Sequence, residues 1–195
     1  MIATETERGR RGGFLSRRDR RGILVVHLAS SIGWLGLDAA LVVLGIVGLA
    51  SGDAVTTRSA FVIDGVLATY LMPVFSLLGL LTGIVLAAGT SWGLFKHWWV
   101  VVSLVITVLM TAAVLLFLVP QMRGLADQAA HLSDAATLSV MSMDRLKLVI
   151  APLAGFIILV YLTGMNVHKP WGRVGAKRQQ AEPEKAASEN AVSES

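Results

Sequence analysis

The chain has 195 residues, of which 54% are hydrophobic and 15% are charged, and its mean hydropathy is +0.67. A soluble globular domain usually carries about 25% charged residues, so this composition leaves too little polar surface to face water on all sides. The absence of cysteine excludes disulfides, thiolate metal sites and cysteine nucleophiles. The composition therefore indicates a membrane protein whose chemistry rests on histidine, carboxylate and hydroxyl groups.

Four segments are apolar enough to cross a membrane. A helix needs about 20 mostly apolar residues to span a hydrocarbon core of about 30 Å. The uncharged stretches that meet this requirement are 65–95, 98–119 and 148–167. A fourth segment, 22–52, meets it apart from His27 and Asp38. We therefore predict an all-α fold, a four-helix transmembrane bundle, with spans at about 23–50, 59–89, 98–119 and 145–167.

Basic residues predict the orientation of the bundle, because Lys and Arg are retained on the cytoplasmic side of short loops. With both termini in the cytoplasm, 13 of the 17 Lys and Arg residues lie on that side. Four of the five tryptophans would lie at the same interface, namely Trp92, Trp98, Trp99 and Trp171. We expect a basic cytoplasmic segment at 1–21 that contacts anionic lipid, a membrane domain at 22–173 and a disordered cytoplasmic tail at 174–195.

A cleaved signal peptide is the alternative interpretation of the N-terminal region. The hydrophobic part of such a signal is about 7 to 15 residues long, whereas the apolar run here is much longer and contains Asp38. The arginine cluster has no recognisable nucleic-acid-binding fold around it, so we expect no nucleic-acid partner. We expect the lipid bilayer as partner, together with either a second copy of the chain or another membrane protein.

Several residues predict how the spans begin, end and pack. Asp64 is expected near the start of the second span, where its charge would complement the helix N-terminus. Pro73 should kink that span, and Pro120 should end the third. Small residues four apart, Gly79 with Gly83 and Ala151 with Gly155, permit close approach of neighbouring helices. The connection at 121–144 has apolar residues at helical spacing, which favours a short helix along the membrane surface.

One face of the first span is polar. His27, Ser31, Trp34 and Asp38 fall within about 40° of one another on a helical wheel. A carboxylate at membrane depth costs at least about 2.5 to 3.5 kcal/mol on insertion scales, so Asp38 should face the bundle interior or water. Three interpretations stay open: a structural hydrogen bond to a neighbouring span, a carboxylate that handles protons or cations, or a position at the outer interface if the first span ends early.

Hydroxyl residues on the third span could face this polar stripe. Ser103, Thr107 and Thr111 recur every four residues and so share one face. The first and third spans run parallel, and the three hydroxyls fall at depths similar to those of the stripe. They would either satisfy the stripe across the bundle, at about 0.6 kcal/mol per contact, or bond to carbonyls of their own helix.

Histidines offer the weak candidates for a metal or haem site. His97 and His168 lie at the cytoplasmic ends of the third and fourth spans, and His27 lies about one to two turns deeper. Paired axial haem ligands must face each other at one depth, which His27 does not share with either of the others. No hydrolase or nucleotide-binding motif is present, so we predict a non-enzymatic protein.

Three runs of sequence resemble a group of small actinobacterial four-span integral membrane proteins that has no established activity: VVHLASSIGWLGLDAALVVLG, GTSWGLFKHWWVVVSLVITVL and HKPWGR. The first span is also distantly similar to the copper-resistance D-type membrane proteins at His27, Trp34 and Gly36. The resemblance implies a four-helix fold with both ends inside the cell and a multi-pass location in the bacterial plasma membrane. The function expected from the residues is stabilisation of the bundle by the polar stripe, or binding of protons or a small solute there. The alternative is a redox subunit that binds haem or a metal such as copper.

Overall fold

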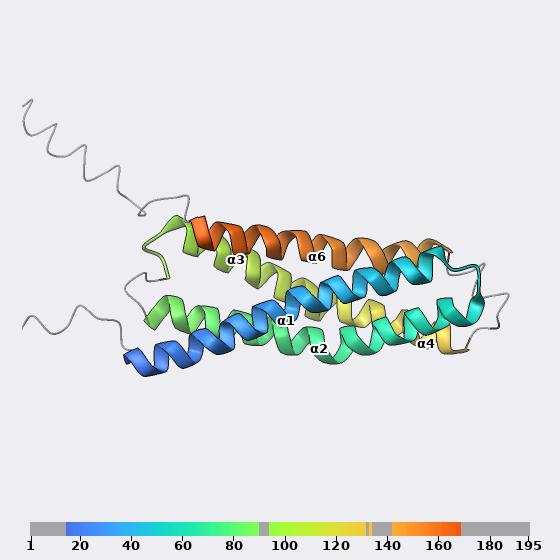
Figure 1. Cartoon of the computed structure of the whole chain (residues 1–195), viewed down its shortest axis with the longest axis horizontal. Coiled ribbons are helices and arrows are strands. Elements are labelled where there is room, and N and C mark those ends of the chain that lie inside the picture. Colours follow the sequence, from blue (N-terminus) through green and yellow to red (C-terminus); the bar gives the residue numbers. More distant parts are fainter. Residues whose placement is uncertain (1–14, 90–93, 132, 134–141, 169–195) are drawn as a thin grey trace, which may run out of the picture.

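A computed structural model describes residues 15–89, 94–131, 133 and 142–168, with side chains of the last segment placed from 146 onward. Within these ranges the elements are α1 (Arg17–Ala50), α2 (Ala54–Gly89), α3 (Trp98–Ala113), the π-helical segment η1 (Val114–Leu118), α4 (Val119–His131) and α6 (Ser142–His168). Because α3, η1 and α4 follow one another without a break, the described residues form four long helices (Figure 1). Each is long and apolar enough to cross a membrane, which confirms the predicted all-α, four-helix fold.

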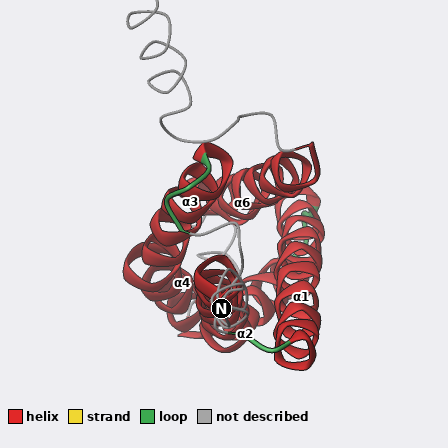
Figure 2. Cartoon of the chain, turned by 90° about the vertical axis from the view of Figure 1, so that its left-hand side faces the viewer, coloured by secondary structure: helices red, strands yellow, loops and turns green. Residues whose placement is uncertain are grey.

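The four long helices run up and down around a ring in chain order (Figure 2). α1 packs against α2 and α6, α2 packs against α4, and α3 completes the ring between α2 and α6. The first turn of α1 and the last turn of α6 lie at the same end of the bundle (Figure 1). We call this the basic end, because its exposed residues include Arg17, Arg18, Arg20 and Arg21. The opposite end is called the far end. That the basic end faces the cytoplasm stays a prediction, and most of the predicted basic segment and the tail at 174–195 lie outside the described residues.

Side-chain caps explain where the first two helices begin. The hydroxyl of Ser16 accepts a hydrogen bond from the amide of Asp19 at 3.1 Å, which satisfies one of the free amides of the first turn of α1. At the start of α2, the carboxylate of Asp53 accepts from the amide of Thr56 at 2.8 Å and from its hydroxyl at 2.7 Å. α2 therefore begins at Ala54, earlier than the predicted 59.

This earlier start corrects the prediction for Asp64. The side chain is 1% exposed and lies well inside α2, so it does not complement the helix N-terminus, a position that Asp53 occupies instead. Asp64 shares a helical face with Phe61, Gly65 and Ala68, all of which are buried. It therefore points into the bundle.

The third long helix continues through Pro120, although proline was expected to end it. A proline ring normally collides with the carbonyl of the fourth preceding residue of an α-helix. Here the preceding turn is π-helical, and the amide of Val119 bonds to the carbonyl of Val114, five residues earlier. This wider turn accommodates the ring. The prediction of a short helix on the membrane surface is therefore wrong for 121–131, where α4 prolongs the third helix and buries Met122, Leu125 and Ala129.

Packing is tightest in the far half of the bundle. One apolar cluster there joins α2, α4 and α6 through Phe61, Ala68, Met122, Leu125, Ala129 and Leu148. A second cluster nearer the middle joins α1, α2 and η1 through Trp34, Leu37, Leu41, Met72 and Val114. Glycines allow backbones to touch, since a Cβ at Gly45 would lie 2.5 Å from the carbonyl oxygen of Leu148. Between these clusters and the basic end, the helices separate around a cavity.

Candidate functional site

The basic half of the bundle encloses a cavity of about 500 Å³ between α1, α2, α3 and α6. Its volume lies within the range of about 300 to 1,000 Å³ that is usual for small-molecule sites. Leucines supply much of the lining, and the side chains in it that carry a polar group are Arg20, His27, Ser31, Trp34, Trp99, Ser103, Thr107, Thr163 and Asn166. The cavity thus brings together three of the four residues of the predicted stripe and two of the three predicted hydroxyls. Thr163 and Asn166 of α6 were not singled out from the sequence.

His27 is held by α2. Its Nδ1 lies 3.1 Å from the carbonyl oxygen of Gly79 and 3.0 Å from the hydroxyl oxygen of Thr82. A carbonyl oxygen can only accept, so Nδ1 carries the hydrogen, and in the neutral ring Nε2 is then an acceptor. Gly83 gives the ring its space, because a Cβ there would lie 3.2 Å from Cε1 of His27.

Two of the three predicted hydroxyls of α3, those of Ser103 and Thr107, bond to groups outside α1. Ser103 donates to the side-chain oxygen of Asn166 at 3.1 Å and so joins α3 to α6. Thr107 donates to the carbonyl of Ser103, one turn earlier in its own helix, at 2.8 Å. Thr111 is buried and has no hydrogen-bond partner among the described residues. These hydroxyls therefore share the cavity with the stripe or lie beyond it, but the hydrogen bonds of Ser103 and Thr107 go to other groups than the stripe.

Asp38 lies one turn deeper than the cavity. Trp34 lines the cavity and is almost fully buried, and Asp38 follows it on the same face of α1. The carboxyl group is 1% exposed, and neither of its oxygens has a hydrogen-bond partner among the described residues. Gly155 of α6 makes room for it, since a Cβ there would lie 2.8 Å from Oδ2. A buried polar group without a partner costs about 1 to 3 kcal/mol, so the fold keeps this carboxyl group at an energetic cost.

A second carboxyl group, that of Asp64, is also buried, although the sequence predicted a position near the start of the second span. Its Oδ1 also has no partner within the described part of the chain. The signal that could have found it is the small and apolar stripe of Phe61, Gly65 and Ala68, which places Asp64 on the packed face of α2. It lies in the far half, next to the contact of Gly65 with Ala126, and does not line the cavity.

His97 and His168 lie at the basic end. His97 precedes the first residue of α3 and packs its ring against that of Trp99, with centroids 6.4 Å apart. The exposed His168 bonds through Nδ1 to the carbonyl oxygen of Gly164 in its own helix, at 2.9 Å. Among the described residues there is no group of three His, Asp or Glu side chains that could hold a metal ion. The haem or metal alternative stays a prediction.

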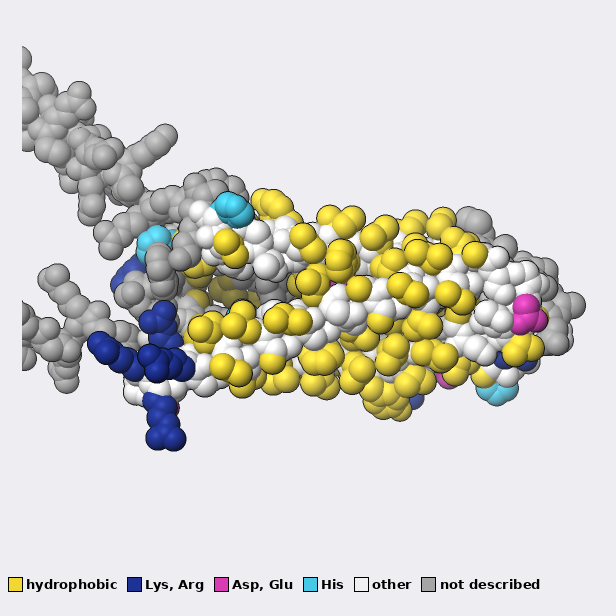
Figure 3. Space-filling model, viewed as in Figure 1, with side chains coloured by type: hydrophobic (Ala, Val, Ile, Leu, Met, Phe, Trp, Pro, Cys, Tyr) yellow, Lys and Arg dark blue, Asp and Glu magenta, His cyan; other side chains and the backbone are white. Residues whose placement is uncertain are grey.

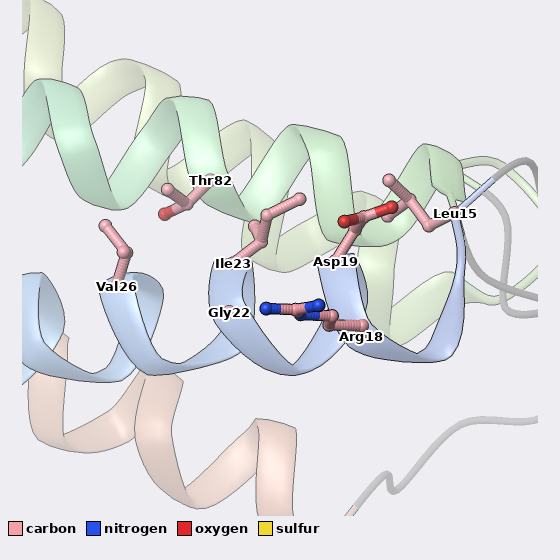
Figure 4. Close-up of a pocket in the computed structure, with 7 residues that line it drawn as sticks. All are labelled: Leu15, Arg18, Asp19, Gly22, Ile23, Val26 and Thr82. Carbon is pink, nitrogen blue, oxygen red and sulfur yellow. The ribbon is translucent and has the colours of Figure 1, made fainter.

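A broader depression of about 660 Å³ lies on the outside of α1 and α2 at the basic end (Figure 4). Two of its polar groups are already engaged: Asp19 accepts from the hydroxyl of Ser16, and Thr82 donates to carbonyls of its own helix. The depression is more open than the interior cavity, and its remaining lining is mainly apolar apart from Arg18. We therefore take the interior cavity as the candidate site.

No protein-family model, curated protein or solved structure matches the chain. The class of protein follows from the length and composition of the described helices: four of them could each cross a membrane, as in a multi-pass membrane protein.

Proposed function

We propose that this membrane protein binds a small solute in the cavity between α1, α2, α3 and α6, without catalysing a reaction, and that the basic end faces the bacterial cytoplasm. The observation that carries the proposal is the convergence of polar groups from three helices, α1, α3 and α6, on one cavity in an otherwise apolar bundle. Such a combination of an apolar wall with a few placed polar groups is typical of small-molecule sites. We also propose that the chain is related to the actinobacterial four-span proteins that its sequence resembles.

The chemistry of the lining favours an amphiphilic solute. Leucine side chains and the ring of Trp34 would contact an apolar body. Nε2 of His27 would accept a hydrogen bond from the solute, and Arg20 at the basic end would attract an anionic group.

Thiol labelling tests whether the cavity is reachable, because the chain has no cysteine of its own. Ser31→Cys and Thr107→Cys each place one thiol in the cavity, and Val43→Cys places one on the lipid-facing surface of α1. In proteoliposomes, a small membrane-impermeant thiol reagent should modify both cavity thiols from the side of the basic end and leave the Val43→Cys thiol unmodified. Equal resistance of all three thiols would contradict the proposal.

The unpartnered carboxyl group of Asp38 supports a second proposed activity, the binding and release of protons beyond the floor of the cavity. Asp38→Asn keeps the shape of the side chain and removes the exchangeable acid. Proton flux into liposomes should fall to the protein-free level in this variant, and it should persist in Asp127→Asn, which alters an exposed carboxylate of α4. Equal flux in wild type and Asp38→Asn would remove the basis for a proton-handling role.

A further inference from the structure

The contact between α1 and α6 is close only in the far half of the bundle. Gly45 touches the backbone at Leu148, and Gly155 touches Asp38. From Asp38 towards the basic end the cavity lies between the two helices, and Figure 3 shows the surface hollowed between them on that face. α1 and α6 therefore diverge towards the basic end.

The cavity opens sideways along this divergence. Leu28 and Ile32 line it, yet they are also 50% and 66% exposed on the surface of α1. Hydrogen bonds at similar depth join two other pairs of neighbouring helices. His27 joins α1 to α2, and Ser103 joins α3 to Asn166 of α6. The exposure of Leu28 and Ile32 therefore places an opening of the cavity between α1 and α6.

The opening lies at the depth of lipid acyl chains. At 1.5 Å per residue, Leu28 and Ile32 are about 12 and 18 Å from Arg20 along α1. One leaflet of the hydrocarbon core is about 15 Å thick, and arginine marks its polar boundary. The side opening therefore faces hydrocarbon, while Arg20 lies at the level of the lipid headgroups.

The charge at the mouth indicates which lipid fits. Arg20 lines the cavity, and the exposed Arg17 and Arg21 lie within one turn of it. A phosphate that is not balanced by a cationic headgroup is the complement of this cluster. The interior beyond it is walled largely by leucine, which suits an acyl chain.

We propose that an anionic phospholipid of the leaflet at the basic end inserts one acyl chain between α1 and α6 into the cavity, with its phosphate at Arg20. This inference rests on the proposed function, because it identifies the solute of the same cavity as a lipid. The second acyl chain stays in the bilayer, so the lipid is held in place without leaving the membrane.

Photocrosslinking in proteoliposomes tests the inference. The probes are phosphatidylglycerol and phosphatidylcholine, each carrying a diazirine in one acyl chain, and crosslinked residues are located by mass spectrometry. We expect phosphatidylglycerol to label Trp34 inside the cavity at least fivefold more than phosphatidylcholine does. Ile32→Trp, which fills the opening, should abolish this labelling, whereas Ile46→Trp, on the lipid-facing surface of the far half, should not change it. Arg20→Gln should reduce the preference for phosphatidylglycerol.

Labelling confined to lipid-facing residues such as Val43, equal labelling of Trp34 by both lipids, or labelling of Trp34 that survives Ile32→Trp would each overturn the inference. Thiol labelling of Ser31→Cys separates this failure from that of the proposed function. A reactive Ser31→Cys thiol without lipid crosslinks at Trp34 leaves a cavity for a water-borne solute. An unreactive thiol without those crosslinks removes both proposals.

Discussion

The contact of Gly45 with α6 gives the sharpest test of the packing. A Cβ at this position would lie 2.5 Å from the carbonyl oxygen of Leu148 and 2.7 Å from its carbonyl carbon. Ordinary contacts of this kind begin near 3.4 Å, so Gly45→Ala must push the two backbones apart by about 1 Å. Overpacking of this size costs about 1 to 3 kcal/mol, which raises the unfolding equilibrium constant by about 5- to 150-fold.

Gly36→Ala is the matched control, because a Cβ at Gly36 of the same helix would meet no atom within 4 Å. Alanine is favoured over glycine in a helix by about 0.5 to 1 kcal/mol, so this variant should be as stable as the wild type or more stable. Both variants would be unfolded in mixed micelles with increasing sodium dodecyl sulfate, with tryptophan fluorescence and circular dichroism as readouts. Identical transitions for Gly45→Ala and Gly36→Ala would refute the close contact between α1 and α6.

Three further predictions follow from individual contacts. His27→Leu should lower stability by about 0.6 kcal/mol in the same micelle assay, because the hydrogen bond that Nδ1 shares between Gly79 and Thr82 of α2 is lost, and a rise in stability would contradict this bond. At Asp53, the hydrogen bond from the Thr56 hydroxyl, followed by that from its amide, holds the pKa of the carboxyl group below its ordinary value of 3.8. The hydrogen-bonded carboxylate of Asp53 therefore stabilises the fold above pH 3.8, and this stabilisation is lost as the pH falls through the lowered pKa. Asp53→Ala should reduce the acid sensitivity of unfolding. An unchanged pH profile in this variant would argue against the cap. Gly65→Ala should destabilise the bundle, because its Cβ would collide with the side chain of Ala126 in α4. Gly124→Ala should not, because a Cβ there meets no atom within 4 Å. Equal effects of the two variants would refute the contact between Gly65 and α4.

The sequence was sufficient to predict the four spans, because the length of an apolar run is a property of each segment alone. The pairing of small residues was equally local: Gly79 and Gly83 both lie against α1, where Ser30, Trp34 and His27 are their neighbours. Helical periodicity also placed His27, Ser31 and Trp34 on one face, and all three line the cavity.

Partners across the bundle could not be predicted in the same way. His27 bonds to α2, although hydroxyls of the third span were the expected neighbours, because the rotation of each helix about its axis depends on the packing of all four. The interior position of Asp64 was missed for a local reason. Asp53, three residues before Thr56, starts α2 earlier than the apolar run begins, so the charge of Asp64 was mistaken for a boundary.

The π-helical turn at Val114–Leu118 determines which neighbours the two halves of the third long helix face. A turn that holds one additional residue rotates everything after it by about 100° relative to an uninterrupted α-helix. The half before Val114 therefore presents Ser103 and Thr107 to the cavity, while the half after Leu118 presents Met122 and its neighbours to α2. A single-residue deletion within the turn would let it close as an ordinary α-helical turn and would keep the second half facing its partner, whereas closing it without a deletion would rotate that half away. This short segment thus lets one continuous helix line a cavity with its first half and pack into the apolar core with its second half.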